Sequence, residues 1–583
     1  MSKKWVVTAK KADFDRIAQE FSISPYLARI IRNRDAVTDE QISMYLCADI
    51  SMMHDPALLK DMEEAASVLS DAIEAQIPIR IVGDYDIDGV CASYILKKGI
   101  AAAGGMADVR LPERMKDGYG INENIIRQAD EDGIELIITC DNGIAAADEI
   151  GLASSLGMSA IVTDHHEVPY EEKDGKKQYR IPFADAVIDP KRPDDDYPFE
   201  GICGGMVAYK LISYLYNSTD IGETVEGKDK LLEEFLSFAA FATVGDLMEL
   251  VDENRVAVKR GLEILKKTEN KGMRALMEAT GTDPESLSAY HIGFVLGPCI
   301  NATGRLETAD AALELFFEDS YEKALEAARE LVKINISRRN LTDAFTNKAI
   351  AMVEEKYSDD KVLVVYMPDC HQSIAGIVAG KLKEKFYKPS IVLTDDTDGN
   401  IKGSARSIEA YSMYDELNKV RELFVKFGGH KMAAGLSMPA GTADELRRRL
   451  NDSCALTDDD MIEKMRIDIP LPIGYVSDEF VSELDKLEPF GIANPKPLFA
   501  EKNVKIKSIE LAGTDRKVLR MRLEGPGRDG NYKSLPAVIF NDAEKAYEDL
   551  KDKETVSILY QAGFNVYKGT KSVQLVIKDY IIP

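Results

Sequence analysis

The sequence has little of several features that mark whole classes of protein. Its 583 residues include seven cysteines, one tryptophan and six histidines. The cysteines are scattered, none forms a Cys-x-x-Cys pair and their number is odd, which favours free thiols in a reducing cytoplasm over a disulfide framework. No stretch approaches the ~20 apolar residues that a membrane helix needs. The first residues, Met-Ser-Lys-Lys-Trp, do not form an apolar signal segment. We therefore expect a cytoplasmic protein that does not contact a membrane.

Positive charge is also in short supply. The chain has 73 Lys and Arg against 100 Asp and Glu, a formal net charge of −27. Such a chain is repelled, on average, by nucleic acid and by anionic membranes, which excludes binding through bulk positive charge. It does not exclude an enzyme that acts on nucleic acid, because bound divalent cations and a local basic groove can reverse the field at the site.

The remaining composition is that of an ordinary globular protein. Hydrophobic residues make up 45% and charged residues 30%, so disorder, collagen and coiled coil are excluded as the main class. The length predicts three or four domains. We divide the chain into an N-terminal helical segment (1–75), a first α/β domain (76–265), a helical connector (266–356), a second α/β domain (357–456) and a C-terminal domain (457–583).

Four short apolar runs in the first α/β domain each end at an aspartate. The runs cover residues 79–82, 136–139, 160–163 and 186–188, and the acids are Asp84, Asp141, Asp164 and Asp189. Continuous apolar strands that alternate with helices predict a parallel sheet covered on both faces. In open α/β sheets the ligand site lies at the carboxyl ends of the strands. These acids should therefore converge.

The rest of the chain shows three further patterns. Residues 310–356 are rich in Ala, Leu, Glu, Lys and Arg without proline, which predicts a long connecting helix. A second α/β pattern starts at residue 361. The last ~115 residues alternate polar and apolar positions between Gly- and Pro-containing turns, which indicates a small β-barrel.

The most informative segment is Gly83-Asp84-Tyr-Asp86-Ile-Asp88-Gly89. Three acids at alternate positions directly after an apolar strand cannot all be buried without a balancing cation. Carboxylates suit hard ions such as Mg²⁺ and Mn²⁺. The alternatives are a solvated turn or a calcium loop, but a calcium loop of the helix-loop-helix type carries Glu at loop position 12, where this chain has Ile95.

A second signal is Asp164-His165-His166. An adjacent histidine pair is notable in a chain with six histidines, and imidazole together with carboxylate favours Mn²⁺ over Mg²⁺. Asp141 and Asp246 add two more acids at the ends of elements. Any one of these acids alone would more often be a helix cap. Their combination within one domain predicts a metal centre.

This ordered set resembles the DHH phosphoesterase superfamily, which is named for the Asp-His-His motif. Further motifs resemble those of the RecJ family of single-strand-specific DNA exonucleases, and the resemblance runs from about residue 20 to the end. One departure is Gly245 before Asp246, where a small residue such as Ala is expected. As a second departure, we expect no extra C-terminal domain of the kind that some members carry. The motifs are Arg114-Met-Lys-Asp-Gly-Tyr-Gly120, Gly297-Pro-Cys-Ile-Asn-Ala-Thr-Gly-Arg305, Gly403-Ser-Ala-Arg-Ser407, Phe427-Gly-Gly-His-Lys-Met-Ala-Ala-Gly435 and Pro489-Phe-Gly-Ile-Ala-Asn-Pro-Lys-Pro497.

The resemblance implies a fold and an activity. The fold would be α/β, with a DHH lobe built on a parallel sheet, a DHHA1-like lobe, a long helix joining them, and a C-terminal OB-fold barrel. The activity would be a metal-dependent 5′→3′ exonuclease that degrades single-stranded DNA to 5′ mononucleotides in recombination and repair. A helicase and a single-strand-binding protein are the implied partners.

The resemblance also implies a site with two Mn²⁺ or Mg²⁺ ions, which can activate a water for in-line attack on phosphorus. Asp141 would bridge the ions, and Asp164, His166 and Asp88 would lie behind the ligands or face the phosphate. Asp164 and His166 are also among the expected catalytic residues. The expected metal ligands are Asp84, Asp86, Asp141, His165 and Asp246.

The substrate would be held by polar residues in Gly-flanked motifs. We expect Arg406 and Ser404 to bind a 5′-terminal phosphate, because arginine offers a fork of donors. A single arginine would more often form a surface ion pair. The wider expected set is Arg114, Asn301, Arg305, Ser404, Arg406 and His430. In the barrel, Tyr560, Phe564, Tyr567, Lys568 and Lys571 are candidates for contact with single strands, although barrel aromatics are more often core.

Two other functions are compatible with parts of this pattern. One is a related phosphoesterase acting on short oligoribonucleotides, cyclic dinucleotides or pyrophosphate, but such enzymes would not need the barrel. The other is a structural DNA-binding protein that has lost catalysis, but here every expected metal position is an Asp or a His. Metal-dependent degradation of 5′-phosphorylated single strands, compared with duplex, distinguishes these functions.

Overall fold

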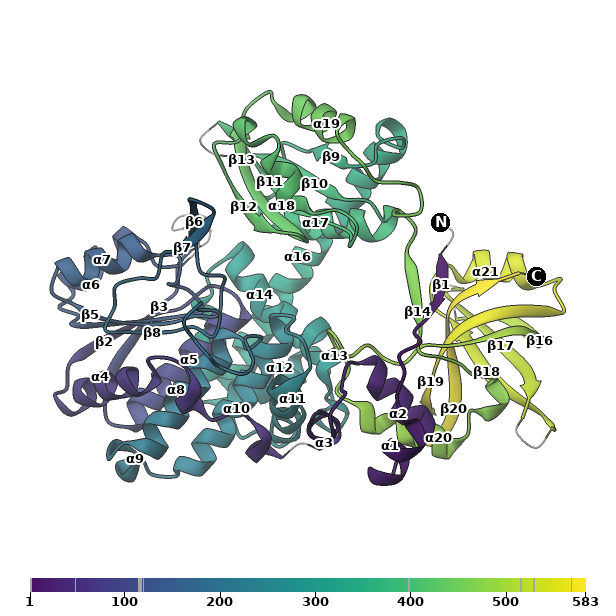
Figure 1. The fold of residues 1–583 in the computed structure, drawn as a ribbon, viewed down its shortest axis with the longest axis horizontal. Helices are drawn as coiled ribbons and strands as arrows, with labels where there is room; N and C mark the ends of the chain where they lie inside the picture. Colours follow the sequence, from purple (N-terminus) through teal and green to yellow (C-terminus); the bar gives the residue numbers. More distant parts are fainter. Residues whose placement is uncertain are drawn as a thin grey trace. The chain divides into compact units, whose positions relative to one another are not determined.

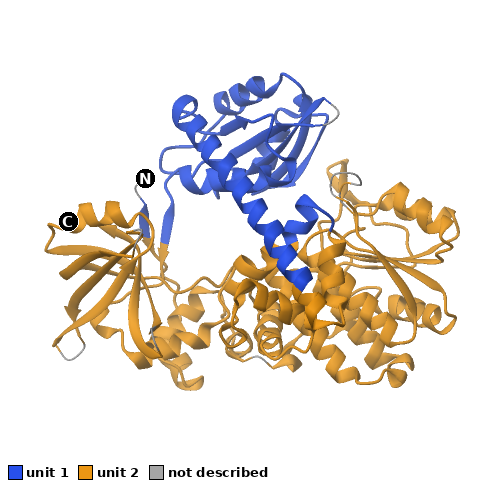
Figure 2. Ribbon diagram, turned by 180° about the vertical axis from the view of Figure 1, so that it is seen from behind, with its two compact units in different colours: residues 1–5, 301–308, 326–465 blue, residues 6–300, 309–325, 466–583 orange. Residues whose placement is uncertain are grey.

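The structure is a computed structural model. It describes residues 3–582 apart from 48, 114–117, 119, 397–398, 514–515, 528–529 and 568. The chain forms two compact units (Figure 2). Unit 1 comprises residues 1–5, 301–308 and 326–465, and unit 2 comprises residues 6–300, 309–325 and 466–583. Within the described residues, no helix has both the length and the apolar character needed to cross a membrane.

A five-stranded parallel sheet lies at the centre of the first part of unit 2. Its strand order is β3-β2-β4-β5-β8, and neighbouring strands pair in parallel throughout. This confirms the parallel sheet expected from the continuous apolar runs. The strands are β2 (Pro78–Val82), β3 (Met106–Arg110), β4 (Leu136–Cys140), β5 (Ser159–Thr163) and β8 (Ala186–Ile188).

Helices cover both faces of this sheet (Figure 1). On one face, side chains of α6 and α7 pack against Val82, Ile137 and Val162 in a common apolar core. Helices α4, α5, α8 and α10 lie on the other face. A small antiparallel hairpin, β6 (Tyr170–Lys173) with β7 (Lys176–Tyr179), follows β5. The helices are α4 (Met62–Glu74), α5 (Ile87–Ala102), α6 (Glu123–Glu131), α7 (Ala147–Ser155), α8 (Gly204–Ser218), α9 (Ile221–Thr224) and α10 (Lys228–Gly245).

The first 60 residues add short helices to unit 2, but they do not begin with one. Strand β1 (Lys4–Val7) precedes them and pairs with β14 (Lys464–Ile467), so the expectation of helix alone was wrong there. The backbone polar groups of an isolated extended segment are satisfied by this distant partner strand, which local sequence cannot reveal. The helices that follow are α1 (Phe14–Glu20), α2 (Pro25–Asn33) and α3 (Asp39–Leu46).

The connector is helical, as expected, but it is interrupted. The predicted long helix over 310–356 is divided into α15 (Asp310–Phe317) and α16 (Tyr321–Lys356). Glu318 is extended, and the Ser320 carbonyl accepts the first hydrogen bond of α16, from the Ala324 N–H. A serine at this position is a favourable helix start. The other helices are α11 (Asp252–Leu265), α12 (Lys271–Thr280), α13 (Ala289–His291) with a π-helical turn (Ile292–Leu296), and α14 (Gly297–Leu306).

The C-terminal domain is a closed barrel. The sheet order is β15-β16-β17-β18-β20-β19, and pairing of β16 with β19 closes it. The alternating segments of the sequence form β16, β17, β19 and β20, which confirms the predicted barrel. The elements are β15 (Ile469–Pro470), α20 (Asp478–Leu484), β16 (Phe499–Ala512), β17 (Val518–Pro526), β18 (Tyr532–Ile539), α21 (Ala543–Leu550), β19 (Thr555–Tyr567) and β20 (Thr570–Ile581).

The second α/β domain forms most of unit 1. Its sheet has the order β12-β13-β11-β10-β9; β9 and β10 are parallel, and the other neighbours are antiparallel. The strands are β9 (Leu363–Tyr366), β10 (Ser390–Asp395), β11 (Asn400–Arg406), β12 (Lys426–His430) and β13 (Ala433–Pro439). The helices are α17 (Gln372–Phe386), α18 (Met413–Asn418) and α19 (Ala443–Asp452).

Candidate metal centre

The expected acids lie where the chain order of the parallel sheet reverses. Strand β2 pairs with β3 on one side and with β4 on the other, and in such sheets the ligand site is expected at the carboxyl ends of these two central strands. Asp84 follows β2 and Asp141 follows β4. Asn142 ties the two strand ends together, because its amide donates to the carbonyls of Val82 (3.0 Å) and Cys140 (2.9 Å).

The start of α5 places the other acids of the first motif. Asp86 is the N-cap, and its carboxylate accepts hydrogen bonds from the N–H groups of Asp88 (2.9 Å) and Gly89 (3.3 Å). Only glycine fits at position 89, since a Cβ there would lie 2.4 Å from the Asp84 carbonyl oxygen. This close approach of the helix to its preceding loop holds Asp84 and Asp86 side by side.

Asp88 is turned inward and caps a second helix. Its side chain is fully buried and accepts hydrogen bonds from the N–H groups of Gly204 and Gly205, both at 2.7 Å. These amides begin α8, and a helix N-terminus favours a negative charge. A Cβ on Gly204 would lie 2.7 Å from the Asp141 Cβ, so the glycine also lets α8 approach the centre.

The Asp164 carboxylate organises the Asp-His-His motif. One oxygen accepts the His165 N–H (2.7 Å) and lies 2.7 Å from His166 Nδ1. The other accepts the Ile144 N–H at 2.9 Å. Both oxygens therefore hold protein groups, and the carboxylate fixes the His166 imidazole and the backbone at His165.

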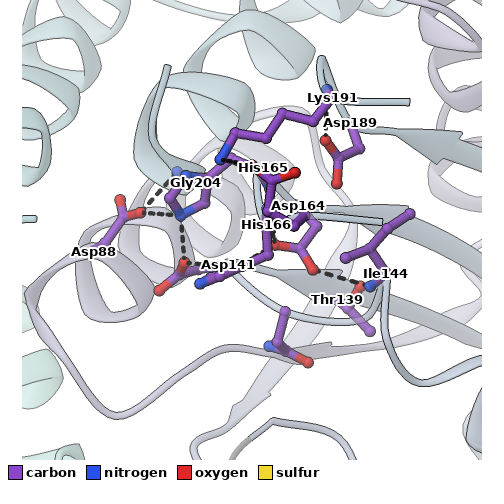
Figure 3. A network of polar contacts seen from close by, with 12 residues as sticks. Asp88, Thr139, Asp141, Ile144, Asp164, His165, His166, Asp189, Lys191 and Gly204 are labelled. Carbon is purple, nitrogen blue, oxygen red and sulfur yellow. Dashed lines mark hydrogen bonds and ion pairs between the residues drawn. The ribbon is translucent and has the colours of Figure 1, made fainter. Parts of the chain in front are cut away.

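His165 brings acids from three elements together (Figure 3). Its Nε2 lies 3.0 Å from an Asp141 oxygen and 3.4 Å from an Asp88 oxygen, and Figure 3 shows both contacts. The same atom lies 3.9 Å from an Asp246 oxygen. Asp246 forms the C-cap of α10. The expected convergence of Asp141, Asp164, His165 and Asp246 is therefore present in the structure.

The electrostatics of this cluster favour the binding of positive charge. Burial, together with the charges of Asp88, Asp86 and Asp84, raises the pKa of Asp141 well above its usual value. Burial and the charges of Asp88 and Asp86 raise the pKa of Asp246 to about 8. Carboxylates held this close cannot all ionise unless cations offset their repulsion.

The histidines respond in opposite directions. Burial lowers the pKa of His165, which favours the neutral imidazole that metal ions bind. Burial also opposes protonation of His166, but the hydrogen bond and charge of Asp164 outweigh it and raise the pKa of His166 to about 9.

The residues present fit divalent cations. Three groups of side chains have ligand atoms within 4.8 Å of one another: Asp84, Asp86 and Asp141; Asp141, His165 and His166; and Asp88, His165 and Asp246. Asp141 belongs to two of these groups, as a bridging carboxylate should. The grouping also includes Asp88 and His166, which the sequence did not suggest as ligands.

One buried acid near the centre, Asp189, was expected to converge with the others but was not among the expected catalytic or metal-binding residues. Asp189 follows β8, is fully buried, and has a pKa of about 8 because burial and the charge of Asp164 disfavour its ionised form. The register of β5 and β8 pairs Thr163 with Ile188, so Asp164 and Asp189 end neighbouring strands. A signal for it was present, since Asp189 ends an apolar run in the same way as Asp141 and Asp164.

The residues expected to hold a terminal phosphate gather in unit 1. Arg406 and Ser404 lie on β11, and both approach Gly376 of α17: a Cβ there would be 3.0 Å from Arg406 Nη2 and 3.5 Å from the Ser404 side chain. Ala433 on β13 pairs with both Arg406 and His430. His430 therefore lies level with Arg406 across the sheet, and it is exposed.

Two further expected residues lie on α14. Arg305 Nη1 donates to the Ser373 carbonyl at 2.6 Å, which joins it to the first turn of α17. Asn301, four residues earlier, shares its helix face. Arg114, also expected to contact phosphate, lies outside the described residues.

The barrel residues that were expected to contact single strands lie in different environments. Tyr560 is fully buried and donates to the Leu471 carbonyl at 2.8 Å, so the suggestion that it contacts single strands was wrong. Its position on β19 directs the ring into the barrel core. Phe564 is half-buried, and Lys571 Nζ lies 3.7 Å from its ring centroid. The Tyr567 side chain and Lys568 lie outside the described part of the chain.

The parallel sheet, the acids at its reversal point and the Asp-His-His motif define a phosphoesterase of the DHH class. Three family models match the chain: the DHH family N-terminal domain over residues 78–243, the DHHA1 domain over 359–455 and the RecJ OB domain over 467–579. The chain belongs to the RecJ family of single-stranded-DNA-specific exonucleases.

Individual relatives agree with this assignment. The chain is 34% identical to the single-stranded-DNA-specific exonuclease RecJ of Bacillus subtilis, over 99% of this chain and 70% of the relative. It is 28% identical to the RecJ of Haemophilus influenzae, over 97% and 98%. The crystal structure of RecJ from Thermus thermophilus in complex with Mn²⁺ matches with a TM-score of 0.82 at 25% identity, covering 100% of this chain and 80% of that one.

Proposed function

We propose that this protein is a metal-dependent 5′→3′ exonuclease that degrades single-stranded DNA to 5′ mononucleotides. The observation that carries the proposal is the cluster of buried carboxylates around His165, in which repulsion raises the pKa values of Asp141 and Asp246. A phosphodiesterase needs positive charge where negative charge develops on phosphorus, and this cluster is suited to hold it as metal ions.

Two Mn²⁺ or Mg²⁺ ions would be held by side chains drawn from the three overlapping groups. The proposed ligands are Asp84, Asp86, Asp141, His165 and Asp246. When bound, such ions activate water as a nucleophile at neutral pH and offset charge on the attacking and leaving oxygens.

The surrounding residues keep these ligands in place. Asp88 is fixed by the two amides at the start of α8 and lies 3.4 Å from His165 Nε2. Asp164 holds the backbone N–H of His165 and the imidazole of His166 through its own hydrogen bonds. We assign Asp88 and Asp164 to positioning, because groups behind metal ligands set their orientation and basicity.

Substrate binding is assigned to polar residues of unit 1 and to the barrel. The two ends of a strand differ at the terminal phosphate, so directionality needs a pocket for one terminus. Arg406 offers a fork of guanidinium donors and Ser404 a hydroxyl, which suits a dianionic phosphate. Asn301, Arg305 and His430 would contact neighbouring phosphates, as would Arg114.

The activity is tested with 5′-phosphorylated single strands in Mn²⁺ and in chelator, with analysis of the products. Mononucleotides released from the 5′ end only with metal support the proposal. Preferred cleavage of oligoribonucleotides, cyclic dinucleotides or pyrophosphate would favour a related phosphoesterase. Metal-independent binding without cleavage would indicate a structural DNA-binding protein.

The direction of degradation is tested with Arg406→Ala. A charge-assisted hydrogen bond contributes roughly 1.5–3 kcal/mol, so the preference for a 5′-phosphate over a 5′-hydroxyl end should fall about ten- to a hundredfold in kcat/KM. Arg448→Ala, which removes an exposed arginine of the same unit, should keep the preference. Equal slowing of both substrates by Arg406→Ala would argue for general strand positioning instead.

We further propose a setting for this reaction. The division at residues 75, 265, 356 and 456 would separate the helical segment, the DHH catalytic domain, the connector, the substrate-binding domain and the barrel.

All seven cysteines are free thiols, which suits a reducing cytoplasm. Because single strands must first be exposed, a helicase and a single-strand-binding protein are the expected partners in recombination and repair.

A further inference from the structure

We propose that Lys191 is a further catalytic residue, whose ammonium group contacts the phosphate that undergoes hydrolysis. The inference rests on the proposed function, because it assigns a contact within that same site. Lys191 belongs to none of the expected motifs, and it lies in the loop that follows β8.

The backbone of this loop is held firmly against the sheet. The buried Asp189 carboxylate accepts the Lys191 N–H at 2.8 Å. Next along the chain, the Arg192 side chain is buried, donates to the Val187 carbonyl, and forms ion pairs with Asp61 and Asp194. Lys191 therefore extends from a fixed base rather than from a mobile loop.

The side chain of Lys191 is directed toward the metal centre. Figure 3 shows it extending from the end near Asp189 toward His165 and Gly204. At this position its positive charge acts on His165 and on the Asp246 carboxylate. Only 24% of the side chain is exposed, so these charges interact through little solvent.

The contact that Lys191 makes in the structure is a weak one. Its Nζ lies 3.6 Å from an oxygen of Glu167, whose side chain is 88% exposed. Exposed ion pairs of this kind contribute little, so Glu167 would release the ammonium group to a phosphate at small cost. An ammonium is a flexible point charge suited to a non-bridging phosphate oxygen.

The position of Lys191 predicts an effect on metal binding that can be measured without the hydrolysis reaction. A lysine beside a cation site repels the cation, so Lys191→Met should bind Mn²⁺ about three- to tenfold more tightly in the absence of DNA. Damage to the site would change the affinity in the opposite direction. The measurement is calorimetric titration of the full-length protein with Mn²⁺, with Lys176→Met, an exposed lysine of β7, as control.

The role in the reaction is measured on 5′-phosphorylated single strands at saturating Mn²⁺. Loss of one group that stabilises transition-state charge costs on the order of 10²-fold in kcat. Lys191→Met should show this loss with KM within about threefold of the parent, since one contact among many phosphates is removed. Lys191→Arg keeps the charge and should recover most of kcat. Glu167→Gln should leave kcat within about threefold.

The results of these two measurements distinguish a catalytic role of Lys191 from other roles. Unchanged kcat in Lys191→Met would overturn the proposal and leave Lys191 as the partner of Glu167. Weaker Mn²⁺ binding together with reduced kcat would overturn it in favour of a structural role. If the parent protein degrades no single-stranded DNA, the proposed function fails, and this role of Lys191 fails with it. The Mn²⁺ titration would then still report whether its charge lies beside the cluster.

Discussion

At the scale of single residues, the metal centre is a compromise between stability and function. Asp141 is 3% exposed and adopts a left-handed backbone conformation with φ of 60°, a region that few residues other than glycine occupy. Its carboxylate faces several others, and burial with their charges raises its pKa. Such strain and repulsion are tolerated at functional sites.

This repulsion predicts the behaviour of Asp141→Asn. The amide keeps the shape but removes one negative charge, so the metal-free protein should gain roughly 1–3 kcal/mol of stability. Hydrolysis should be abolished, and binding of single-stranded DNA should stay within about tenfold of the parent, because the carboxylate organises ions rather than the strand. Thermal unfolding with and without Mn²⁺, and fluorescence anisotropy, measure these effects.

The matched control is Asp130→Asn, an exposed acid of α6 in the same unit. It should change neither metal-free stability nor turnover. Near-normal Mn²⁺-dependent hydrolysis by Asp141→Asn would contradict its assignment as a bridge. A metal-free protein that becomes less stable would contradict the repulsion argument.

Gly245, the departure from the expected pattern, has a local explanation. A Cβ at this position would lie 2.5–3.0 Å from three side-chain carbons of Ile87, so the isoleucine occupies the space that an alanine methyl would need. Overpacking of this kind costs about 1–3 kcal/mol. We therefore expect Gly245→Ala to destabilise the protein and to disturb the neighbouring Asp246.

A double-mutant cycle tests this explanation. In an Ile87→Ala background the space is vacant, and Gly245→Ala should then be neutral or stabilising, with a coupling energy of about 1 kcal/mol or more. Equal effects of Gly245→Ala in both backgrounds, measured by urea denaturation, would show that Ile87 is not the cause.

At the scale of elements, α11 connects segments that are far apart in the sequence. Arg255 is 1% exposed, and its guanidinium donates to the carbonyls of Tyr45, Leu487, Glu488 and Pro489. The group also lies 3.7 Å from the centroid of the Tyr45 ring. Carbonyl dipoles and an aromatic face thus solvate this buried cation.

Because the contacts depend on the planar guanidinium group, we expect Arg255→Lys to destabilise the protein although the charge is kept. A lysine offers three donors from one atom and cannot reach carbonyls on both sides, so unsatisfied buried groups should cost about 2–4 kcal/mol. Arg260→Lys is the control on the same helix, where the side chain is 35% exposed and forms surface ion pairs; its effect should stay within about 0.5 kcal/mol. Urea denaturation followed by circular dichroism measures both, and equal effects would contradict the role of the fork.

The elements also show why some structure could be predicted and some could not. Strands β4, β5 and β8 are buried on both faces, which leaves continuous apolar runs in the sequence. The edge strand β3 and the hairpin β6–β7 are largely exposed, so hydrophobicity does not mark them. The hairpin did carry a turn signal, Asp174-Gly175 with both φ angles positive.

The candidate site, too, could be predicted from the sequence only in part. Acids at strand ends could be predicted to converge, because parallel strands bring their carboxyl ends to one edge of the sheet. Asp88 caps α8, which begins more than about 100 residues later in the chain. Lys191 approaches His165, which lies about 25 residues earlier. No local pattern encodes such contacts.

At the scale of the whole molecule, a net charge of −27 must be reconciled with a polyanionic substrate. Average repulsion disfavours non-specific capture of duplex, so we expect binding to rely on a few local cations and on aromatic contacts to unpaired bases. Asp84 and Asp141 are 2% and 3% exposed. We therefore expect a phosphodiester to enter a recessed site, where a base-paired strand would bring its partner strand with it.

Strand selection follows from this recessed site. We expect a blunt duplex and a duplex with a 3′ overhang to resist degradation, whereas a 5′-phosphorylated 5′ overhang is degraded as far as the junction. Unpairing costs about 1.4 kcal/mol per base-pair step, so each duplex step taken without a helicase should be slowed by about tenfold. The measurement compares initial rates on the three duplexes and on the free strand, at equal ends and without any helicase. A duplex whose 5′ overhang carries a hydroxyl controls for end recognition and should be slowed only by the terminal-phosphate effect. Equal rates on blunt duplex and free single strand would contradict a site that admits one strand.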